Sequence, residues 1–236
     1  MNNTPSLSFV LPMFNESENI RTTIQEIKSL AQEITDAYEI IVVDDASTDG
    51  CGDIVEDMAH QDNHVRFFRL LRNTKFGGAL SEGLRRVVYD YAMYMDSDMP
   101  VSAEDIKKSL LFIAHADIVT AYSTIRKGDT LKRKIMSSVY NFMVRTLFGI
   151  DIKDINSGYK IIRGDFLKKI KLISNSPFVD VELFLYAKRH NLKIHQYPLI
   201  FRSRSGGTSH IARPSVVLAT LIDMFRIKYL SLWFSV

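Results

Sequence analysis

Residues 39–50, EIIVVDDASTDG, join a run of β-branched apolar residues to a turn rich in aspartate, serine and glycine. A short apolar run bounded by turn residues predicts a strand, and the turn leads into a predicted helix over residues 53–60. The strand runs directly into Asp44 and Asp45, so two carboxylates stand where it leaves the sheet. The sequence thus predicts a strand, an acidic turn and a helix in succession.

The same alternation of strand and helix extends to both sides of this unit. Apolar strands separated by helices predict an α/β fold with a mostly parallel sheet that is covered on both faces. In such folds, ligands bind at the carboxyl ends of the strands. The predicted elements of this half are strands over residues 7–11, 65–71 and 91–95, a helix over residues 77–89, and a helix with Ser17 as its N-cap that carries Ile20, Ile24, Ile27, Leu30 and Ile34.

The second half of the chain is predicted to be more irregular, as expected of a half that binds a substrate. Its predicted helices cover residues 103–116, 130–148 and 181–190, and its predicted strands cover residues 117–122, 159–163 and 193–201. We expect one domain over residues 1–213, with a first half at about 1–100 and a second half at about 101–213. Residues 214–236 are expected to form an amphipathic helix.

Composition limits the classes of protein to be considered. The chain has 236 residues, of which 46% are hydrophobic and 24% are charged, and this is typical of a globular domain. A net charge of +3 gives no support for nucleic-acid binding. The single cysteine, Cys51, excludes an internal disulfide, and the start MNNTPS lacks a signal-peptide pattern. We therefore expect a cytosolic protein.

The stretch YMDSDMP ends another apolar run in two aspartates, Asp96 and Asp98. Together with Asp45, these carboxylates converge on one edge of the predicted sheet. Like charges gathered in one crevice destabilise each other unless a cation or hydrogen-bond donors are present. Mg²⁺ and Mn²⁺ suit oxygen ligands, and Mg²⁺ often combines one or two carboxylates with substrate phosphates. Taken alone, Asp-Ser-Asp is also an ordinary turn and helix-cap sequence.

Four motifs, taken together, resemble those of family 2 glycosyltransferases, within which the polyprenyl-phosphate hexosyltransferases such as dolichol-phosphate mannose synthase are most similar. The resemblance runs from about residue 6 to residue 209 and implies the GT-A fold, a Rossmann-like three-layer sandwich. Further matches are Asn73 with Gly77, Gly78 and Gly83, then Arg133 with Ser137, then residues 181–183, and then Arg204 with Gly207 and Ser209. The four motifs are VLPMFNE (10–16), VVDDASTDG (42–50), MDSD (95–98) and DINSGYK (154–160).

The resemblance implies that the half at about 1–100 binds the nucleotide and that the half at about 101–213 binds the acceptor. It also implies roles for individual residues. It implies a metal, Mg²⁺ or Mn²⁺, held by Asp98 and Asp96. The implied catalytic residues are Asp98, Arg126 and Arg133. The implied nucleotide-sugar site consists of Pro12, Phe14, Glu16, Val43, Asp45, Asp96, Ser97 and Arg204. The implied contacts to the acceptor phosphate are Arg126, Arg133, Ser137 and Arg202.

The chain departs from the family pattern at two places. Pro100 stands where the family often has a polar residue that can ligate the metal, which implies looser metal binding or ligation by water. The family often has Ser-Arg or Tyr-Arg after the next strand, whereas this chain has Tyr122 and Ser123 with the nearest arginine at Arg126.

The leading hypothesis is an inverting transferase that moves a hexose from a UDP- or GDP-sugar to a polyprenyl phosphate. A lipid phosphate is ionised at neutral pH and needs no general base, whereas a hydroxyl acceptor does. Six arginines of the second half could bind such a phosphate: Arg126, Arg133, Arg145, Arg163, Arg202 and Arg204.

Two rival hypotheses remain open. In the first, the acceptor is a saccharide or protein hydroxyl, with Asp180 or Glu182 as the base. Otherwise, Asp154 and Glu182 are interpreted as carboxylates that order loops. In the second rival, the protein is a catalytically silent nucleotide-binding subunit, an interpretation that Pro100 and the displaced arginine favour.

A lipid acceptor requires contact with a membrane. Residues 131–149 begin with basic residues and continue with apolar ones, and the terminal stretch adds Tyr229 and Trp233 as interfacial anchors. Asp223, Arg226 and Lys228 make the terminal stretch too charged to span a bilayer. We therefore expect peripheral contact with the cytosolic face of a membrane, or contact with a partner subunit or a second copy of the chain.

Overall fold

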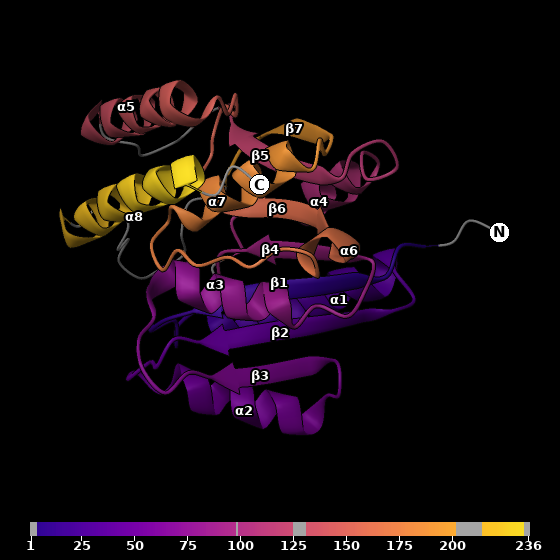
Figure 1. Ribbon diagram of the computed structural model, residues 1–236. Helices are drawn as coiled ribbons and strands as arrows, with labels where there is room; N and C mark the ends of the chain where they lie inside the picture. Colours follow the sequence, from indigo (N-terminus) through magenta and orange to yellow (C-terminus); the bar gives the residue numbers. More distant parts are fainter. Residues whose placement is uncertain (1–3, 98, 125–130, 202–213, 234–236) are drawn as a thin grey trace.

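A single mixed sheet forms the centre of the molecule (Figure 1). The computed structural model describes residues 4–97, 99–124, 131–201 and 214–233. Within these residues the strand order is β3-β2-β1-β4-β6-β5-β7, and β6 alone runs antiparallel to its neighbours β4 and β5. The strands are β1 (Leu7–Met13), β2 (Tyr38–Asp44), β3 (Val65–Arg69), β4 (Tyr91–Met95), β5 (Ile118–Ser123), β6 (Tyr159–Arg163) and β7 (Ile194–Leu199).

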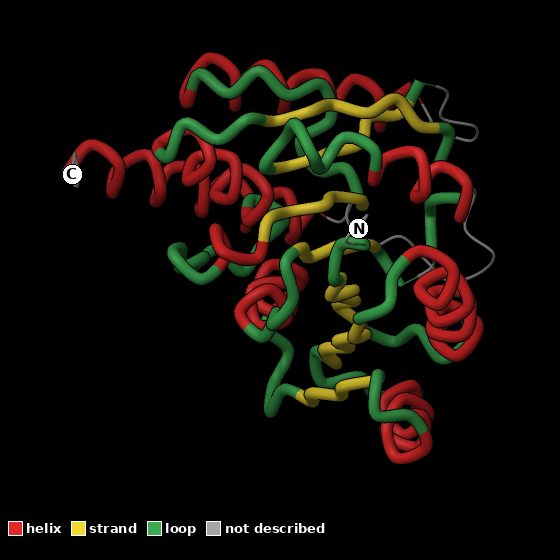
Figure 2. The backbone as a smooth tube through the Cα atoms, turned by 90° about the vertical axis from the view of Figure 1, so that its right-hand side faces the viewer, coloured by secondary structure: helices red, strands yellow, loops and turns green. Residues whose placement is uncertain are grey.

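Helices pack on both faces of this sheet (Figure 2). One face is covered by α1, α2 and α4, and the other by α3, α5, α6, α7 and α8. The helices are α1 (Ile20–Ile34), α2 (Cys51–Gln61), α3 (Lys75–Arg85), α4 (Ala103–Leu110), α5 (Leu131–Phe148), α6 (Gly164–Leu167), α7 (Val179–Arg189) and α8 (Pro214–Trp233). The predicted α/β three-layer sandwich with a mostly parallel sheet is confirmed.

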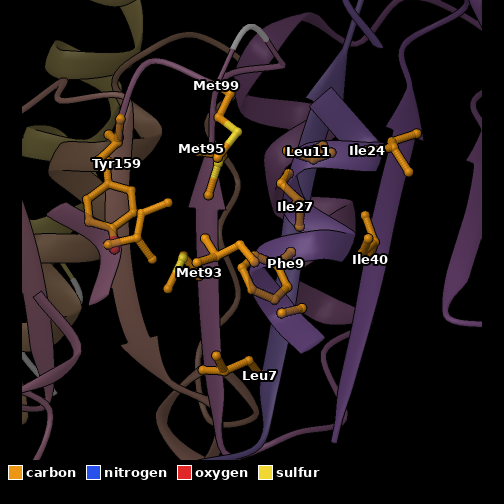
Figure 3. Close-up of a cluster of buried hydrophobic side chains, with 14 of the residues drawn as sticks. Leu7, Phe9, Leu11, Ile24, Ile27, Ile40, Met93, Met95, Met99 and Tyr159 are labelled. Atoms are coloured by element: carbon orange, nitrogen blue, oxygen red, sulfur yellow. The ribbon is translucent and has the colours of Figure 1, made fainter. Parts of the chain in front are cut away.

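Side chains of the central strands alternate between two hydrophobic clusters. Phe9 and Leu11 of β1 face α1 in the first cluster, where Met93 and Met95 of β4 also lie (Figure 3). Val10, between Phe9 and Leu11, faces the second cluster on the α3 side. Because successive residues of a strand point to opposite faces, a strand covered on both sides must be apolar throughout. All seven residues of β1 are buried, and all but Ser8, whose hydroxyl donates to the Glu39 carboxylate at 2.5 Å, are apolar.

Several predicted boundaries differ from those of the structure. The helix predicted to begin after Ser17 begins at Ile20, and residues 17–19 form a turn in which the backbone N–H of Ser17 donates to Asp49 Oδ2 at 2.8 Å. The helix predicted to reach residue 116 ends at Leu110 and continues as tighter turns. The remaining elements agree to within a few residues.

The second half does not build a layer of its own. Its strands β5, β6 and β7 continue the sheet of the first half, with β6 inserted next to β4. Helix α8 packs on the α7 side through Met224 and Ile227. Within the described ranges, no helix combines the length and the apolar character that crossing a membrane requires. The division into two functional halves stays a prediction.

Candidate functional site

Three neighbouring parallel strands bring their carboxyl ends together. Strand β1 lies between β2 and β4, with Met13 of β1 paired with Asp44 of β2. The Ser97 hydroxyl donates to the carbonyl of Pro12 at 2.7 Å, which ties the segment after β4 to the end of β1. The segments that follow these strands, which carry Glu16, Asp45 and Asp96, therefore share one edge of the sheet. The predicted convergence of the motifs is confirmed for these positions.

Hydrogen bonds join the loops that follow β1 and β2. The N–H of Asn15 donates to the Ser47 hydroxyl at 2.9 Å, and the N–H of Thr48 donates to Asn15 Oδ1 at 2.9 Å. Glu16 accepts a bond of 3.0 Å from the side-chain amide of Asn19. Phe14 and Glu16 are only partly buried, so they can reach a ligand at this edge. The two motifs thus form one hydrogen-bonded surface.

The adjacent aspartates after β2 have different environments. Asp44 is fully buried and accepts hydrogen bonds from Arg69 Nε at 3.0 Å and from the N–H of Ser47 at 2.9 Å. Asp45 Oδ1 accepts from the N–H of Thr74 at 2.5 Å and from its hydroxyl at 2.8 Å. Burial raises the pKa of Asp45, and the Thr74 donors partly offset this rise. Thr74 therefore fixes the orientation of the Asp45 carboxylate.

A turn of the DINSGYK motif holds the aspartate after β4. The N–H of Asp96 donates to the carbonyl of Gly158 at 3.3 Å. A Cβ atom added at Gly158 would lie only 2.5 Å from Asp96 Oδ2. The missing side chain thus leaves a cradle that the carboxylate fills. Ser97, by contrast, is buried, and its carbonyl accepts from the Thr23 hydroxyl at 2.7 Å. Ser97 therefore connects β1, α1 and β4.

Strained backbone concentrates at the same edge. Among the described residues, five other than glycine have positive φ, and four of these follow the carboxyl ends of β1 to β4. Left-handed backbone costs roughly 1–2 kcal/mol for most residues, and functional sites are where such strain commonly gathers. The four residues are Asn15 (55°), Ala46 (59°), Lys75 (68°) and Met99 (44°).

The donor set fits a hard divalent cation that is shared with a ligand. Within the described part of the chain, no three His, Cys, Asp or Glu side chains are grouped so that they could hold a metal by themselves. A cation that uses one or two protein carboxylates and takes its other ligands from a diphosphate and water needs no such group. Asp96, which lies against the Gly158 cradle, is available as one such carboxylate, and Asp98 lies outside the described residues.

The remaining predicted site residues lie on α5, in the core or outside the described residues. Ser137 is partly buried on α5, where Arg133 also lies at a position whose side chain is not described. Val43 is fully buried in the second hydrophobic cluster near Gly83, so we leave its side chain out of the proposed binding set. Arg126, Arg202 and Arg204 lie outside the described residues.

Two further arginines of the second half pair with nearby carboxylates. Arg145 contacts Asp151 at 2.8 Å, and Arg163 contacts Asp117 at 3.0 Å and Asp165 at 2.7 Å. In the sheet, Arg163 of β6 lies opposite Tyr91, which is at the amino end of β4. It therefore lies at the edge of the sheet opposite to the acidic site, which does not fit the suggested contact to a phosphate.

Both carboxylates suggested as a base for a hydroxyl acceptor are buried and engaged. Asp180 is 2% exposed and forms an ion pair with Lys160 at 2.9 Å. Glu182 is 3% exposed and accepts from the backbone N–H groups of Ile173 and Ser174 at 2.9–3.0 Å. Burial raises the pKa of both carboxyl groups. Neither fits a base that contacts an acceptor, and Glu182 instead orders the segment before α7.

Two supporting residues were missed from the sequence. Thr74, which orients Asp45, follows Asn73, whose side chain donates to the Asp45 carbonyl at 3.2 Å. Lys160 is fully buried in β6; it ends the DINSGYK motif and stands inside the apolar run YKII, but no role was predicted for it.

Known glycosyltransferases are similar to this chain over most of its length. An undecaprenyl-phosphate mannosyltransferase of Micrococcus luteus is 27% identical over 213 residues, which cover 86% of this chain and 86% of that protein. A dolichyl-phosphate beta-glucosyltransferase of Saccharomyces cerevisiae is 25% identical over an alignment that is 250 positions long, gaps included, and that covers 95% of this chain and 75% of that protein.

Solved structures show the same fold. The glucosyl-3-phosphoglycerate synthase of Mycobacterium tuberculosis, in complex with Mn²⁺, UDP and phosphoglyceric acid, has a TM-score of 0.70 at 20% identity, covering 96% of this chain and 78% of that chain. A mannosyltransferase of Pyrobaculum calidifontis, in complex with GDP-Man and Mn²⁺, has a TM-score of 0.66 at 16% identity, covering 95% of this chain and 65% of that chain. The family model described as glycosyl transferase family 2 matches residues 8–171, which is well over half of the sequence, and the chain therefore belongs to this family.

Proposed function

We propose that the protein is a metal-dependent, inverting glycosyltransferase that moves a sugar from a nucleotide diphosphate sugar to a polyprenyl phosphate. The observation that carries this proposal is the acidic edge of the sheet, where Asp45 is oriented by Thr74 and Asp96 lies in the Gly158 cradle. The relatives named for undecaprenyl-phosphate and dolichyl-phosphate acceptors support the choice of a lipid phosphate.

Each part of the proposed donor site has a chemical task. The segment with Pro12, Phe14 and Glu16, together with Asp45, would bind the base and ribose of the nucleotide. A divalent cation held by Asp96 and Asp98 would stabilise the negative charge that develops on the departing diphosphate. Solved structures of the same fold in complex with Mn²⁺ support this assignment.

The buried carboxylates favour a phosphate acceptor over a hydroxyl. A hydroxyl must lose a proton as it attacks the anomeric carbon, and Asp180 and Glu182 are engaged in buried interactions. An ionised phosphate oxygen attacks directly, and one displacement inverts the anomeric configuration. The acceptor then needs cations, for which we retain Arg126, Arg133, Arg202 and Arg204, with Ser137 as a hydrogen-bonding partner.

Helix α8 supports peripheral contact with a membrane. It packs on the α7 side through Met224 and Ile227 and leaves a line of apolar side chains on its outer face. The members of this line, spaced by four, three and four residues, are each more than half exposed: Leu218, Ile222, Phe225 and Tyr229. On α5, which lies beside α8 in Figure 1, Val139 and Phe142 are also exposed.

An exposed apolar face flanked by basic residues suits the headgroup region of a bilayer. Lys132, Arg133 and Lys134 lie near the start of α5, and Arg226 lies on α8. We place this face on the cytosolic side of the membrane, where nucleotide sugars and the lipid phosphate would meet.

The test is a transfer assay with the full chain. UDP- and GDP-hexoses are incubated with a polyprenyl phosphate or with saccharide acceptors, in Mn²⁺, in Mg²⁺ or in EDTA. We expect metal-dependent formation of a lipid-linked sugar with inverted configuration, and loss of turnover in Asp98→Ala. Transfer to saccharides alone, or nucleotide binding without consumption of any donor, would contradict the proposal and support one of the two rivals.

A further inference from the structure

A charged side chain is buried inside the sheet next to the proposed donor site. Lys160 of β6 is fully buried, and Nζ lies 5.0 Å from the ring centre of Tyr94 and 5.5 Å from that of Phe184. A buried ammonium group is costly unless its charge is balanced and its three N–H donors are satisfied. The contacts of Lys160 must therefore supply a negative charge and three hydrogen-bond acceptors.

The ammonium group of Lys160 has three oxygen partners. Nζ lies 2.7 Å from the Tyr94 hydroxyl, 2.8 Å from the carbonyl of Ser157 and 2.9 Å from Asp180 Oδ1. The Tyr94 hydroxyl in turn contacts Asp180 Oδ1 and also lies 3.3 Å from the carbonyl of Ser157. Three donors thus meet three acceptors, and the charge is balanced by Asp180.

One of these partners belongs to the turn that holds Asp96. Strand pairing sets Tyr94 opposite Lys160 and Met95 opposite Tyr159, so the next pair along the ladder is Asp96 and Gly158. Lys160 Nζ holds the carbonyl of Ser157, and the following residue, Gly158, accepts the N–H of Asp96 and lies against its carboxylate. A continuous set of contacts therefore connects the buried ammonium to the proposed metal ligand.

Stability alone gives a weak reason for this buried pair. Replacing a buried ion pair by uncharged residues of similar size is often neutral for folding, whereas removing one partner alone is strongly destabilising. A group that fixes a ligand-binding carboxylate has a different effect, because a displacement on the order of 1 Å at a reacting centre costs about 10²-fold in rate.

We propose that Lys160 is a positioning residue that, by holding the carbonyl of Ser157, sets the Gly158 turn against Asp96 and so orients this carboxylate toward a cation bound with a nucleotide diphosphate. Asp180 is the counter-ion that balances the charge of Lys160, and Tyr94 bridges the two. The inference rests on the proposed function for the role of Asp96, and it adds a residue that does not touch the substrate.

Two variants separate positioning from stability. Lys160→Met combined with Asp180→Asn removes both charges together with the donor to Ser157. Asp180→Asn alone keeps that donor but leaves the lysine without its counter-ion. The double variant should therefore be the more stable of the two, and the single variant should have the better-oriented site.

The readouts are the thermal unfolding midpoint and the Mn²⁺ concentration that half-saturates binding of UDP or GDP, measured by calorimetry without an acceptor. We expect the double variant to unfold close to the wild-type temperature and to need about tenfold more Mn²⁺. Asp180→Asn should unfold at a lower temperature with a nearly wild-type Mn²⁺ requirement. Tyr94→Phe removes the 3.3 Å contact to the Ser157 carbonyl together with the hydroxyl contacts to Lys160 and Asp180, but it leaves the 2.8 Å bond from Lys160 Nζ to that carbonyl. It should therefore give a smaller rise, on the order of threefold.

Kinetics add a second readout, in which kcat of the double variant falls while KM for the lipid acceptor is unchanged. The inference would be overturned if both the double variant and Tyr94→Phe needed no more Mn²⁺ than the wild type. It would also be overturned if, across all variants, the Mn²⁺ concentration needed rose in step with the loss in unfolding temperature, because destabilisation alone would then explain it. If the wild type transfers sugar to no lipid phosphate, the proposed function fails, and the binding comparison still decides the role of Lys160. If the nucleotide affinity of the wild type does not depend on Mn²⁺, both the proposed function and the proposed role of Lys160 fail.

Discussion

Replacing Gly158 by alanine would place a methyl group against the carboxylate of Asp96. The added Cβ would lie 2.5 Å from Oδ2 and 2.9 Å from Cγ of Asp96, whereas ordinary contacts begin at 3.4 Å. The carboxylate must therefore move by about 0.9 Å. Because φ of Gly158 lies outside the left-handed region, alanine adopts the same backbone without strain.

The cost of this change should fall on activity and hardly on stability. Only the end of a flexible side chain has to give way, so we expect the free energy of unfolding to change by less than about 1 kcal/mol. A displacement of this size at a group that orients the metal and the diphosphate should lower kcat/KM about 10²-fold, or about 2.7 kcal/mol in the activation free energy.

The assay compares Gly158→Ala with Ser157→Ala in the same turn. Ser157→Ala removes a weak hydroxyl contact of 3.5 Å to the Tyr159 carbonyl, keeps the carbonyl that Lys160 holds, and adds no atom near Asp96. We measure kcat/KM against Mn²⁺ concentration and the unfolding midpoint of both variants. The proposed role of Asp96 is refuted if Gly158→Ala keeps the wild-type rate and Mn²⁺ requirement.

Three further predictions concern other parts of the molecule. Thr74→Val removes the hydroxyl donor to Asp45, so KM for the nucleotide sugar should rise severalfold, by about 1 kcal/mol of binding, in steady-state kinetics. Phe225→Asp should weaken sedimentation with anionic lipid vesicles, because this side chain is 63% exposed on the outer face of α8. The Lys28 ammonium lowers the pKa of Asp62 from its ordinary 3.8 to about 2, so this pair stabilises the fold above pH 4 and loses that effect as the pH falls through 2. Chemical denaturation of Asp62→Asn should therefore show a shallower loss of stability between pH 4 and pH 2 than the wild type.

Each of these predictions has its own control. Thr74→Ser keeps the hydroxyl and should keep the wild-type KM, and an unchanged KM in Thr74→Val would mean that the N–H of Thr74 alone orients Asp45. Val88→Asp adds the same charge at a position that is 58% exposed, away from α8, and equal loss of vesicle binding in both variants would contradict a specific face. An identical acid profile in Asp62→Asn and wild type would show that screening at the 42% exposed Lys28 removes the effect.

The sequence predicted the parts of the site that depend on local pattern. Apolar runs that end in carboxylates located β1, β2 and β4, and the rule for parallel sheets placed Asp45 and Asp96 on one edge. The local pattern did not predict that the adjacent residues Asp44 and Asp45 have different environments. Their difference depends on Arg69, which pairs with Asp44, and on Thr74, which caps Asp45, and neither contact has a local signature.

The rest of the site depends on a pairing between distant segments. Sequence patterns gave no reason for β6 to enter the sheet antiparallel beside β4, and this register alone sets Gly158 opposite Asp96. The burial of Asp180 could not be predicted either, because an acidic residue at the start of a helix usually faces solvent. Its burial follows from the lysine of β6, which lies on the same face of the sheet as Tyr94.

Because β6 pairs with β4 from a later part of the chain, the sheet beside β4 is completed late during synthesis. Until residue 163 has left the ribosome, β4 is an open edge of the nascent sheet, and its unpaired backbone groups can pair with other chains. The aspartate that ends β4 would meanwhile lack the turn that orients it. A fragment that stops near residue 100 should therefore aggregate more readily than the whole chain and should have no ordered cation site.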